Sequence, residues 1–254
     1  MEWRRVVSGQ VERVSPYLRA NLGWERAKRR GDRERRVIDS IVRRGMVVAD
    51  VGASAGDFTA RLAFRVGRRG LVHSFEPNPT HRERLERLAH RPQIVFHPVA
   101  LSDHGGRAKL HVPVIRTRPQ HGLATLRTVE EGISLDVPLD TLDRRIDARR
   151  QLNFIKCDVE GHEYAVLKGG ERTIRKSMPT LLIEIERRHG FGIERVFRLL
   201  DEWGYRGEAL FPDGLRPIGE FDVDRDQLAF VESDQDVMPA GYVNTFLFIG
   251  RQGG

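Results

Sequence analysis

The chain has 254 residues, of which 39% are hydrophobic and 31% are charged, and its formal net charge is +7. This length suits one α/β domain or two small ones with a sizeable core, and the composition is typical of a soluble globular protein. No apolar run approaches the roughly 18 residues that span a bilayer, and the first residues lack the apolar core of a signal peptide.

Charged residues of both signs are mixed along the chain, as in ERAKRRGDRERR and HRERLERL. Mixing of this kind is typical of solvated helix faces, so we do not expect nucleic acid as the partner, although the positive charge leaves that reading open. The single cysteine, Cys157, excludes an internal disulfide and favours the reducing cytoplasm as the location.

Residues 1–45 are predicted to form a helical extension ahead of the main domain. Apolar side chains recur near its end at helical spacing, at Val37, Ile38, Ile41 and Val42. Gly45 then suits a helix end just before the first strand.

Strand and helix signals alternate from residue 46 onward. Apolar runs predict strands over 46–51, 70–77, 93–101, 152–161 and 179–186. Helical spacing predicts helices from residue 58 and over 79–90, 162–176 and 193–204. This order predicts an α/β fold with a doubly wound, mostly parallel sheet, closed by an antiparallel pair of C-terminal strands over 205–211 and 243–250.

Residues 103–150 interrupt the alternation. Two predicted strands, 107–114 and 133–142, flank a polar stretch. We expect an inserted hairpin with a mobile loop above the sheet, because long loops in compact domains are often lids or binding elements. The hypothesis places the lid at 116–132, within a single domain over 46–254.

The first predicted strand ends in Asp50, and Gly52 and Gly56 follow before the first helix of the domain. Glycines let the backbone turn tightly and approach a ligand closely. Their spacing is not that of the GxGxxG motif of dinucleotide enzymes. Glu76 ends the second strand, where an acid accepts hydrogen bonds from both hydroxyls of a ribose. The loop and Glu76 together favour a nucleoside ligand over a tight turn that binds nothing.

Six segments, in this order, resemble the S-adenosylmethionine-dependent methyltransferases of the FkbM type: VADVGASAGDFT, SFEPNP, FHPVALSD, VPLDTLD, LNFIKCDVEGHEYAVLKGG and PTLLIEIERRH. They lie within about residues 45–190, and KCDVEGHEYAVLKGG is the most specific of them. The resemblance implies a Rossmann-like class I methyltransferase sheet and S-adenosylmethionine as the cofactor.

The resemblance also implies which residues bind the cofactor. The glycine loop would contact its amino-acid portion, oriented by Asp50, and Glu76 would contact its ribose. Asn78 would help to seat the adenosine, and Ser102 or Asp103 would meet the adenine amino group. The implied cofactor-binding residues are Asp50, Gly52, Ala53, Ser54, Gly56, Glu76, Asn78, Val99, Ala100, Leu101 and Asp158.

Asp158 ends the fourth strand, where this topology places the reacting centre. We expect it to contact the methionine amino group or the substrate, with capping of the next helix as the structural alternative. His162 follows closely and is a candidate general base, because the ordinary pKa of histidine lies near the working pH. A lone histidine early in a helix equally suits a structural place.

Glu184 and Glu186 are two residues apart on the fifth strand, so their side chains share a face. Buried carboxylates are costly unless they are paired or metal-bound. Asp158, Glu186 and His189 are therefore candidate ligands of a Mg²⁺ ion that would activate a substrate hydroxyl. Metal-free catalysis by His189 or His162 is equally compatible, and so is an ion pair between one of the glutamates and an arginine. The candidate catalytic residues are Asp158, His162, Glu186 and His189.

The expected function is methylation of a hydroxyl on a small-molecule, sugar-containing or secondary-metabolite substrate, and the resemblance alone implies this acceptor class. A methyltransferase for nucleic acid or protein is one alternative. A non-catalytic nucleoside-binding protein is another. The oligomeric state stays open, with a homodimer as one option.

Overall fold

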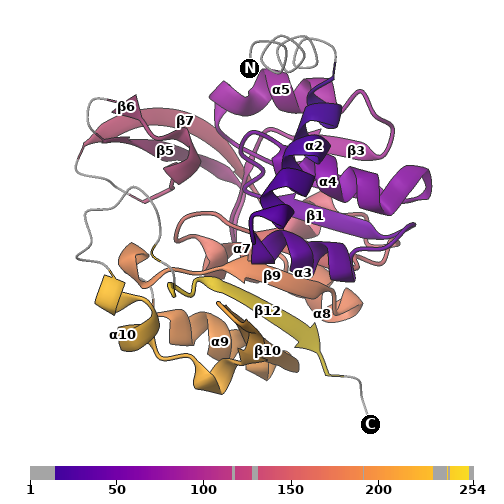
Figure 1. Cartoon of the computed structure of the whole chain (residues 1–254). Coiled ribbons are helices and arrows are strands. Elements are labelled where there is room, and N and C mark those ends of the chain that lie inside the picture. The colour runs from indigo at the N-terminus through magenta and orange to yellow at the C-terminus, as the bar shows by residue number, and fades with distance from the viewer. Residues whose placement is uncertain are drawn as a thin grey trace, which may run out of the picture.

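The central sheet has eight strands in the order β11-β10-β12-β9-β8-β1-β2-β3 (Figure 1). The computed structural model describes residues 15–115, 118–127, 131–190, 192–230, 239 and 241–251. The strands of this sheet are β1 (Val47–Val51), β2 (Leu71–Phe75), β3 (Ile94–His97), β8 (Phe154–Cys157), β9 (Thr180–Glu184), β10 (Tyr205–Phe211), β11 (Gly214–Pro217) and β12 (Thr245–Gly250). The five strands from β3 to β9 pair in parallel, so their carboxyl ends meet at one edge.

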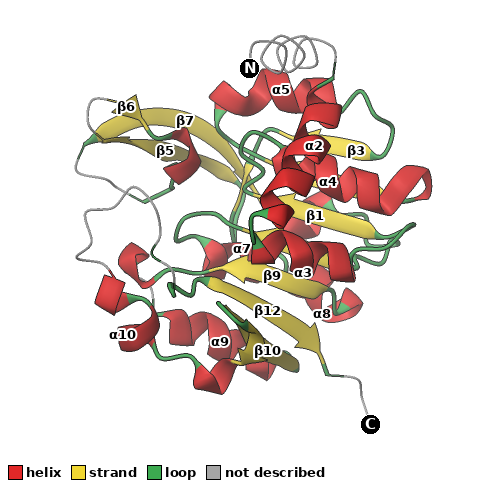
Figure 2. Cartoon of the chain, in the orientation of Figure 1, coloured by secondary structure: helices red, strands yellow, loops and turns green. Residues whose placement is uncertain are grey.

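Helices cover both faces of this sheet (Figure 2). One apolar core lies between the sheet and α2 (Pro16–Arg29), α3 (Arg33–Ile41), α4 (Asp57–Val66) and α5 (Pro79–Leu88). A second core lies on the other face, under α6 (Leu142–Arg145), α7 (Glu163–Gly169), α8 (Glu171–Ser177) and α9 (Ile193–Glu202). The doubly wound, mostly parallel sheet predicted from the sequence is therefore confirmed.

The N-terminal helices begin at side chains that cap them. The Ser15 hydroxyl accepts a hydrogen bond from the Leu18 N–H, and the Asp32 carboxylate accepts one from the Arg35 N–H, so each side chain satisfies a donor that the helix leaves free. Trp24 of α2 then packs edge-on against Phe58 of α4, with ring centroids 5.2 Å apart. The N-terminal helices expected from the sequence are thus present and packed on the domain, while residues 1–14 lie outside the described part.

The C-terminal strands close the sheet as an antiparallel pair, as predicted. β12 pairs antiparallel with both β9 and β10 and so lies between them. β11 extends this end of the sheet through a hairpin with β10, and the sequence reasoning did not predict it. Short elements complete the chain: η1 (Gly67–Arg69), η2 (His121–Leu123), η3 (Arg187–His189), η4 (Ile218–Glu220), α10 (Val223–Asp226) and η5 (Leu228–Phe230).

The single helix predicted over 162–176 is in fact two helices, α7 and α8, which meet at Gly170. A side chain at Gly169 would bring a Cβ within 1.9 Å of the Ser102 carbonyl oxygen. The close contact between this helix end and the segment after β4 (Ala100–Leu101) therefore requires a glycine.

A second, four-stranded sheet stands beside the carboxyl edge of the central sheet, in the order β4-β7-β5-β6 (Figure 1). Its main part is an antiparallel hairpin of β5 (Gly106–Ile115) and β7 (Gly132–Asp140), and β6 (Arg118–Pro119) extends it. β4 joins β7 in parallel and so ties the hairpin to the central fold. No helix in the described ranges is long and apolar enough to cross a bilayer.

Candidate functional site

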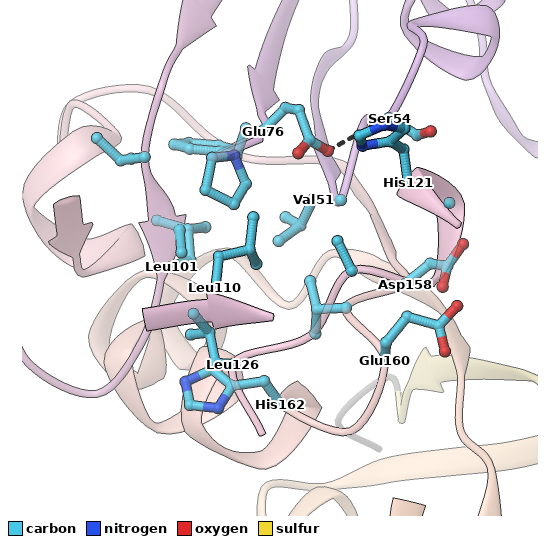
Figure 3. A pocket seen from close by; sticks show the side chains of 18 residues that line it. Val51, Ser54, Glu76, Leu101, Leu110, His121, Leu126, Asp158, Glu160 and His162 are labelled. Carbon is cyan, nitrogen blue, oxygen red and sulfur yellow. Dashed lines mark hydrogen bonds between the residues drawn. The ribbon is translucent and has the colours of Figure 1, made fainter. Parts of the chain in front are cut away.

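A pocket opens where the carboxyl ends of β1, β2 and β8 face the hairpin of the second sheet (Figure 3). About 610 Å³ of space, part of it open to solvent, lies between its side chains. Its lining residues are Val51, Gly52, Ser54, Phe75, Glu76, Pro77, Val99, Ala100, Leu101, Leu110, His121, Gly122, Ala124, Leu126, Asp158, Val159, Glu160 and His162.

Glu76 stands just beyond β2, and its side chain is held by backbone N–H groups. Oε2 accepts a hydrogen bond from the Ser54 N–H at 2.7 Å, and Oε1 accepts one from the Asn78 N–H at 2.7 Å. Burial raises the pKa of this carboxyl to about 7, although the two hydrogen bonds act in the opposite direction. The carboxylate is thus fixed at the pocket wall with acceptor capacity to spare.

The loop after β1 divides into residues that face the pocket and residues that face the core. Gly52 and Ser54 line the pocket, and both have positive φ, at 79° and 46°. A Cβ on Gly52 would lie 1.8 Å from the Asp158 carbonyl oxygen, so the ends of β1 and β8 approach too closely for a side chain. Ala53 is buried in the core, and a Cβ on Gly56 would meet Leu88 of α5 at 2.6 Å. Ala53 and Gly56, which were predicted to contact the cofactor, therefore pack on the protein side of the loop and not on the pocket side.

Asp50 and Asn78 are also supporting residues in this structure. Asp50 is fully buried, and Oδ2 accepts a hydrogen bond from the Thr59 hydroxyl at 2.6 Å. Asn78 caps α5 by accepting a hydrogen bond from the Thr80 N–H, and its own N–H holds Glu76. Neither side chain lines the pocket, so each acts on it through a neighbour.

One end of the pocket is apolar. The predicted Val99, Ala100 and Leu101 line it, together with side chains from the hairpin: Leu110, Ala124 and Leu126. His162 lies beside Leu126 at this end (Figure 3). Its Nε2 is 3.0 Å from the hydroxyl oxygen of the buried Ser102, and burial lowers its pKa, so the ring is neutral. This place suits contact with a flat ring better than proton removal at a reacting centre. Of the two groups expected near an adenine amino group, Ser102 is buried here and Asp103 is exposed.

The opposite end is acidic. The carboxylates of Asp158 and Glu160 lie at the same end and point the same way (Figure 3). Asp158 Oδ2 accepts a hydrogen bond from the buried Lys156 ammonium at 3.0 Å. The N-cap of α7 is His162, so Asp158 does not cap this helix. Glu160 has φ of +52°, a conformation that a residue with a side chain rarely adopts.

The loop after β9 meets Glu160 from behind. His189 Nε2 lies 2.8 Å from Glu160 Oε2. Glu186 forms an ion pair with Arg188, and Oε1 of Glu186 accepts a hydrogen bond from Asn244 at 3.0 Å. Asn244 also donates to Glu184, so the two glutamates share a face, as the strand pattern predicts. Neither Glu186 nor His189 lines the pocket itself.

The predicted metal ligands do not assemble. Within the ranges that the structure describes, no group of three or more His, Cys, Asp and Glu side chains is arranged to hold a metal ion. Asp158 pairs with Lys156 and Glu186 pairs with Arg188, so each carboxylate already has a cation beside it. In this arrangement Asp158, Glu186 and His189 do not fit a shared Mg²⁺ ion.

Sequence reasoning missed the contribution of the hairpin to the pocket. Leu110, His121, Gly122, Ala124 and Leu126 all come from it. His121 Nδ1 is 3.4 Å from Asn78 Nδ2, and the buried Thr125 hydroxyl donates a hydrogen bond to the Glu160 carbonyl oxygen at 2.7 Å. Such contacts join segments far apart in sequence, and only the polarity and length of the stretch signalled a binding element.

A family model, the methyltransferase FkbM domain, matches residues 50–206, which is more than half of the 254 residues. The chain belongs to this family. The match begins within β1 and ends within β10, so it includes the pocket and the inserted hairpin but not α2 and α3. The resemblance to this family found in the sequence is therefore confirmed.

Three solved structures are similar to the chain. The FkbM methyltransferase of Methylobacillus flagellatus is 20% identical with a TM-score of 0.50, over 81% of this chain and 43% of that chain. A Clostridium thermocellum protein described as a putative rRNA methylase is 12% identical with a TM-score of 0.49, over 86% of this chain and 94% of that one. The O-methyltransferase of Thermotoga maritima is 15% identical with a TM-score of 0.42, over 84% of this chain and 63% of that one. The FkbM-family chain thus spans less than half the length of the M. flagellatus protein. No curated protein matches it.

Proposed function

We propose that this FkbM-family methyltransferase binds S-adenosylmethionine in the pocket and methylates a hydroxyl of a small-molecule, sugar-containing or secondary-metabolite acceptor. One observation carries the proposal. The Glu76 carboxylate is fixed by two backbone N–H groups at the wall of a pocket that is apolar at one end and acidic at the other. The parts of S-adenosylmethionine match these two ends, because an adenine ring suits the apolar end and the ammonium group of the amino-acid portion suits the acidic end.

The lining fits each part of this cofactor. Leu101, Leu110 and Leu126 provide apolar contacts for an adenine ring, and Glu76 provides acceptors for the ribose hydroxyls. At Gly52 the loop carries no side chain where the amino-acid portion of the cofactor would lie. The Asp158 carboxylate would accept a hydrogen bond from the ammonium group of that portion. When bound, S-adenosylmethionine supplies an electrophilic methyl group on a sulfonium.

The acidic end supports a hydroxyl acceptor. A hydroxyl must lose its proton during methylation, and a positioned base contributes about 10²–10⁴-fold to such a step. The Glu160 carboxylate lines the pocket, and His189 stands 2.8 Å behind it. We assign proton removal to this pair, with His189 taking up or sharing the proton beside Glu160.

The rest of the rate enhancement comes from alignment. Holding donor and acceptor in line can contribute roughly 7–11 kcal/mol in favourable intramolecular cases. The hairpin side chains Leu110, Ala124 and Leu126 would exclude water from one end, and Asp158 would anchor the tail at the other. The methyl group would then face the carboxylate of Glu160.

Calorimetry tests the cofactor directly. We expect S-adenosylhomocysteine to bind at a ratio of one to one, and NADH not to bind. Glu76→Ala should weaken the binding of S-adenosylhomocysteine at least about tenfold, because both ribose hydroxyls lose their acceptor. The matched control is Glu83→Ala on α5, whose side chain is 84% exposed, and it should bind like the wild type. Binding of NADH instead of S-adenosylhomocysteine would refute the cofactor assignment.

Label transfer tests the acceptor class. The protein is incubated with methyl-labelled S-adenosylmethionine and with three separate fractions of a cell extract: small molecules, RNA and protein. We expect label in the small-molecule fraction only. Label in RNA or protein would support the macromolecular alternative. Cofactor binding without transfer to any fraction would support a non-catalytic protein.

A further inference from the structure

Lys156 is a buried lysine directly behind the acidic end of the pocket. Its residue is 2% exposed, and its side chain does not line the pocket. The ammonium Nζ lies 3.0 Å from Asp158 Oδ2 and 4.4 Å from the centroid of the Phe58 ring. Lysine is rarely buried so completely without a partner, because removing an ammonium group from water is costly. The carboxylate that accepts its hydrogen bond belongs to Asp158, which lines the pocket.

Further carboxylates surround this ammonium group. Burial lowers the pKa of Lys156, but the nearby negative charges raise it by more, so it stays charged. These charges are, in decreasing order of effect, Asp158, Glu34, Asp50 and Glu184. Glu34 belongs to α3, outside the segment that matches the family. Burial raises the pKa values of Glu34, Asp50 and Glu184, and Asp158 is the carboxylate that accepts the hydrogen bond from the ammonium group.

The contact leaves part of the Asp158 carboxylate for a ligand. A carboxylate accepts up to about four hydrogen bonds on its two oxygens. Lys156 occupies Oδ2, and the Asp158 side chain is still 30% exposed toward the pocket. A hydrogen bond from a rigidly packed ammonium fixes the rotation of the carboxylate group, so Oδ1 is presented in one orientation.

We propose that Lys156 is a positioning residue for cofactor binding: it holds the Asp158 carboxylate in the orientation that receives the ammonium group of the cofactor's amino-acid portion. The inference rests on the proposed cofactor site. It also gives the N-terminal helix α3 a part in that site, because the charge of Glu34 acts on the ammonium group that lies over the Phe58 ring of α4.

Calorimetry with S-adenosylhomocysteine tests the inference. Lys156→Met keeps the apolar stem and removes the ammonium, so affinity should fall about tenfold, the effect of losing one well-placed charged hydrogen bond. Lys156→Arg keeps the charge and should stay within about threefold of the wild type. In an Asp158→Asn background, Lys156→Met should change the affinity by less than about twofold, because the group it positions is gone.

A merely structural lysine would behave differently. In that case Lys156→Met would lower the melting temperature and the affinity for S-adenosylhomocysteine by similar amounts in both backgrounds. Lys156→Arg would then not restore binding. Lys168→Met on α7, where the lysine pairs with Glu171 at the surface, is the matched control and should bind normally. Phe58→Leu is a second route if Lys156→Met does not fold. It removes the ring under the ammonium, and we expect about a threefold loss that disappears in the Asp158→Asn background.

The outcomes separate the two proposals. A wild-type protein that does not bind S-adenosylhomocysteine would refute the proposed cofactor site. A wild type that binds, with Lys156→Met of equal affinity or with equal losses in both backgrounds, would overturn only the role of Lys156.

Discussion

His189 Nε2 lies 2.8 Å from Glu160 Oε2, although the two residues come from loops after different strands. The loops are in direct contact, because a Cβ on Gly161 would fall 2.7 Å from the Cβ of His189. Glu160 itself has a positive φ, and strained backbone of this kind clusters at functional sites. The fold thus holds a carboxylate and an imidazole together at the acidic end of the pocket.

This pair should matter for methyl transfer more than for cofactor binding. We expect His189→Gln and Glu160→Gln each to lower kcat by about 10²-fold or more, since a positioned base contributes about that much. The affinity for S-adenosylhomocysteine should change by less than about threefold. His162→Gln is the comparison, and its main effect should fall on cofactor affinity, because His162 lies at the apolar end. Unchanged kcat in both variants would show that His189 and Glu160 do not take up the proton of the acceptor.

Cofactor affinity should depend on pH through Glu76. Burial raises the pKa of this carboxyl to about 7 in the free protein, and only the ionised form offers full acceptor capacity to ribose hydroxyls. At pH 8 the group is mostly ionised, and at pH 6 it is mostly protonated. Affinity for S-adenosylhomocysteine should therefore fall about tenfold as the pH falls from 8 to 6. Glu76→Gln should flatten this dependence, and an equally steep profile in that variant would contradict the assignment.

Gly52 should tolerate alanine poorly. Its φ of +79° strains any side chain, and its Cβ would lie 1.8 Å from the Asp158 carbonyl oxygen, so the ends of β1 and β8 must separate. Gly45 has φ of +85° with open space around it, which makes Gly45→Ala the matched control. In urea unfolding we expect a loss of about 1–2 kcal/mol for Gly45→Ala and at least about 3 kcal/mol for Gly52→Ala. Equal losses would mean that the two strand ends are not in contact.

The hairpin should slow the release of the cofactor. The Thr125 hydroxyl donates a hydrogen bond to the Glu160 carbonyl oxygen at 2.7 Å, and Thr125 is 5% exposed. Thr125→Val leaves that carbonyl unpaired, at a cost of about 1–3 kcal/mol, and should loosen the hairpin over the pocket. By stopped-flow we expect S-adenosylhomocysteine to dissociate at least about fivefold faster, with Thr125→Ser closer to the wild type.

The matched control for this variant is Thr141→Val, which alters the cap of α6 away from the pocket. Equal dissociation rates for Thr125→Val and the wild type would argue against the lid hypothesis for 116–132. Residues 116–117 and 128–130 of that segment lie outside the described part of the chain.

The central sheet could be predicted because its signals are local. Each buried strand is a short apolar run that ends in a polar residue, and that residue marks the carboxyl edge, as Glu76 and Asp158 do. β11 was missed because GLRP carries no apolar alternation. The break at Gly170 was missed, and the contact of the neighbouring Gly169 with the Ser102 carbonyl oxygen joins residues that are distant in sequence.

The site was predictable only in part, for the same reason. Gly52 and Gly56 look alike in sequence, but one touches the end of β8 and the other packs on α5. Whether a glycine faces a ligand or a helix depends on the path of the following chain. The hairpin wall and the lysine behind Asp158 are also tertiary contacts, which no local pattern encodes. The candidate metal ligands could not be judged from sequence, because the cations that pair with Asp158 and Glu186, namely Lys156 and Arg188, reach them only in the folded chain.

The central claim is that Glu76 and the acidic end of the pocket hold opposite parts of one adenosyl cofactor. A crystal structure of the complex with S-adenosylhomocysteine measures this most directly. The account predicts both ribose hydroxyl oxygens within about 3.2 Å of the Glu76 carboxylate, the adenine ring against Leu101 and Leu110, and the amino group at Asp158. A ribose bound away from Glu76, or a ligand outside this pocket, would contradict it.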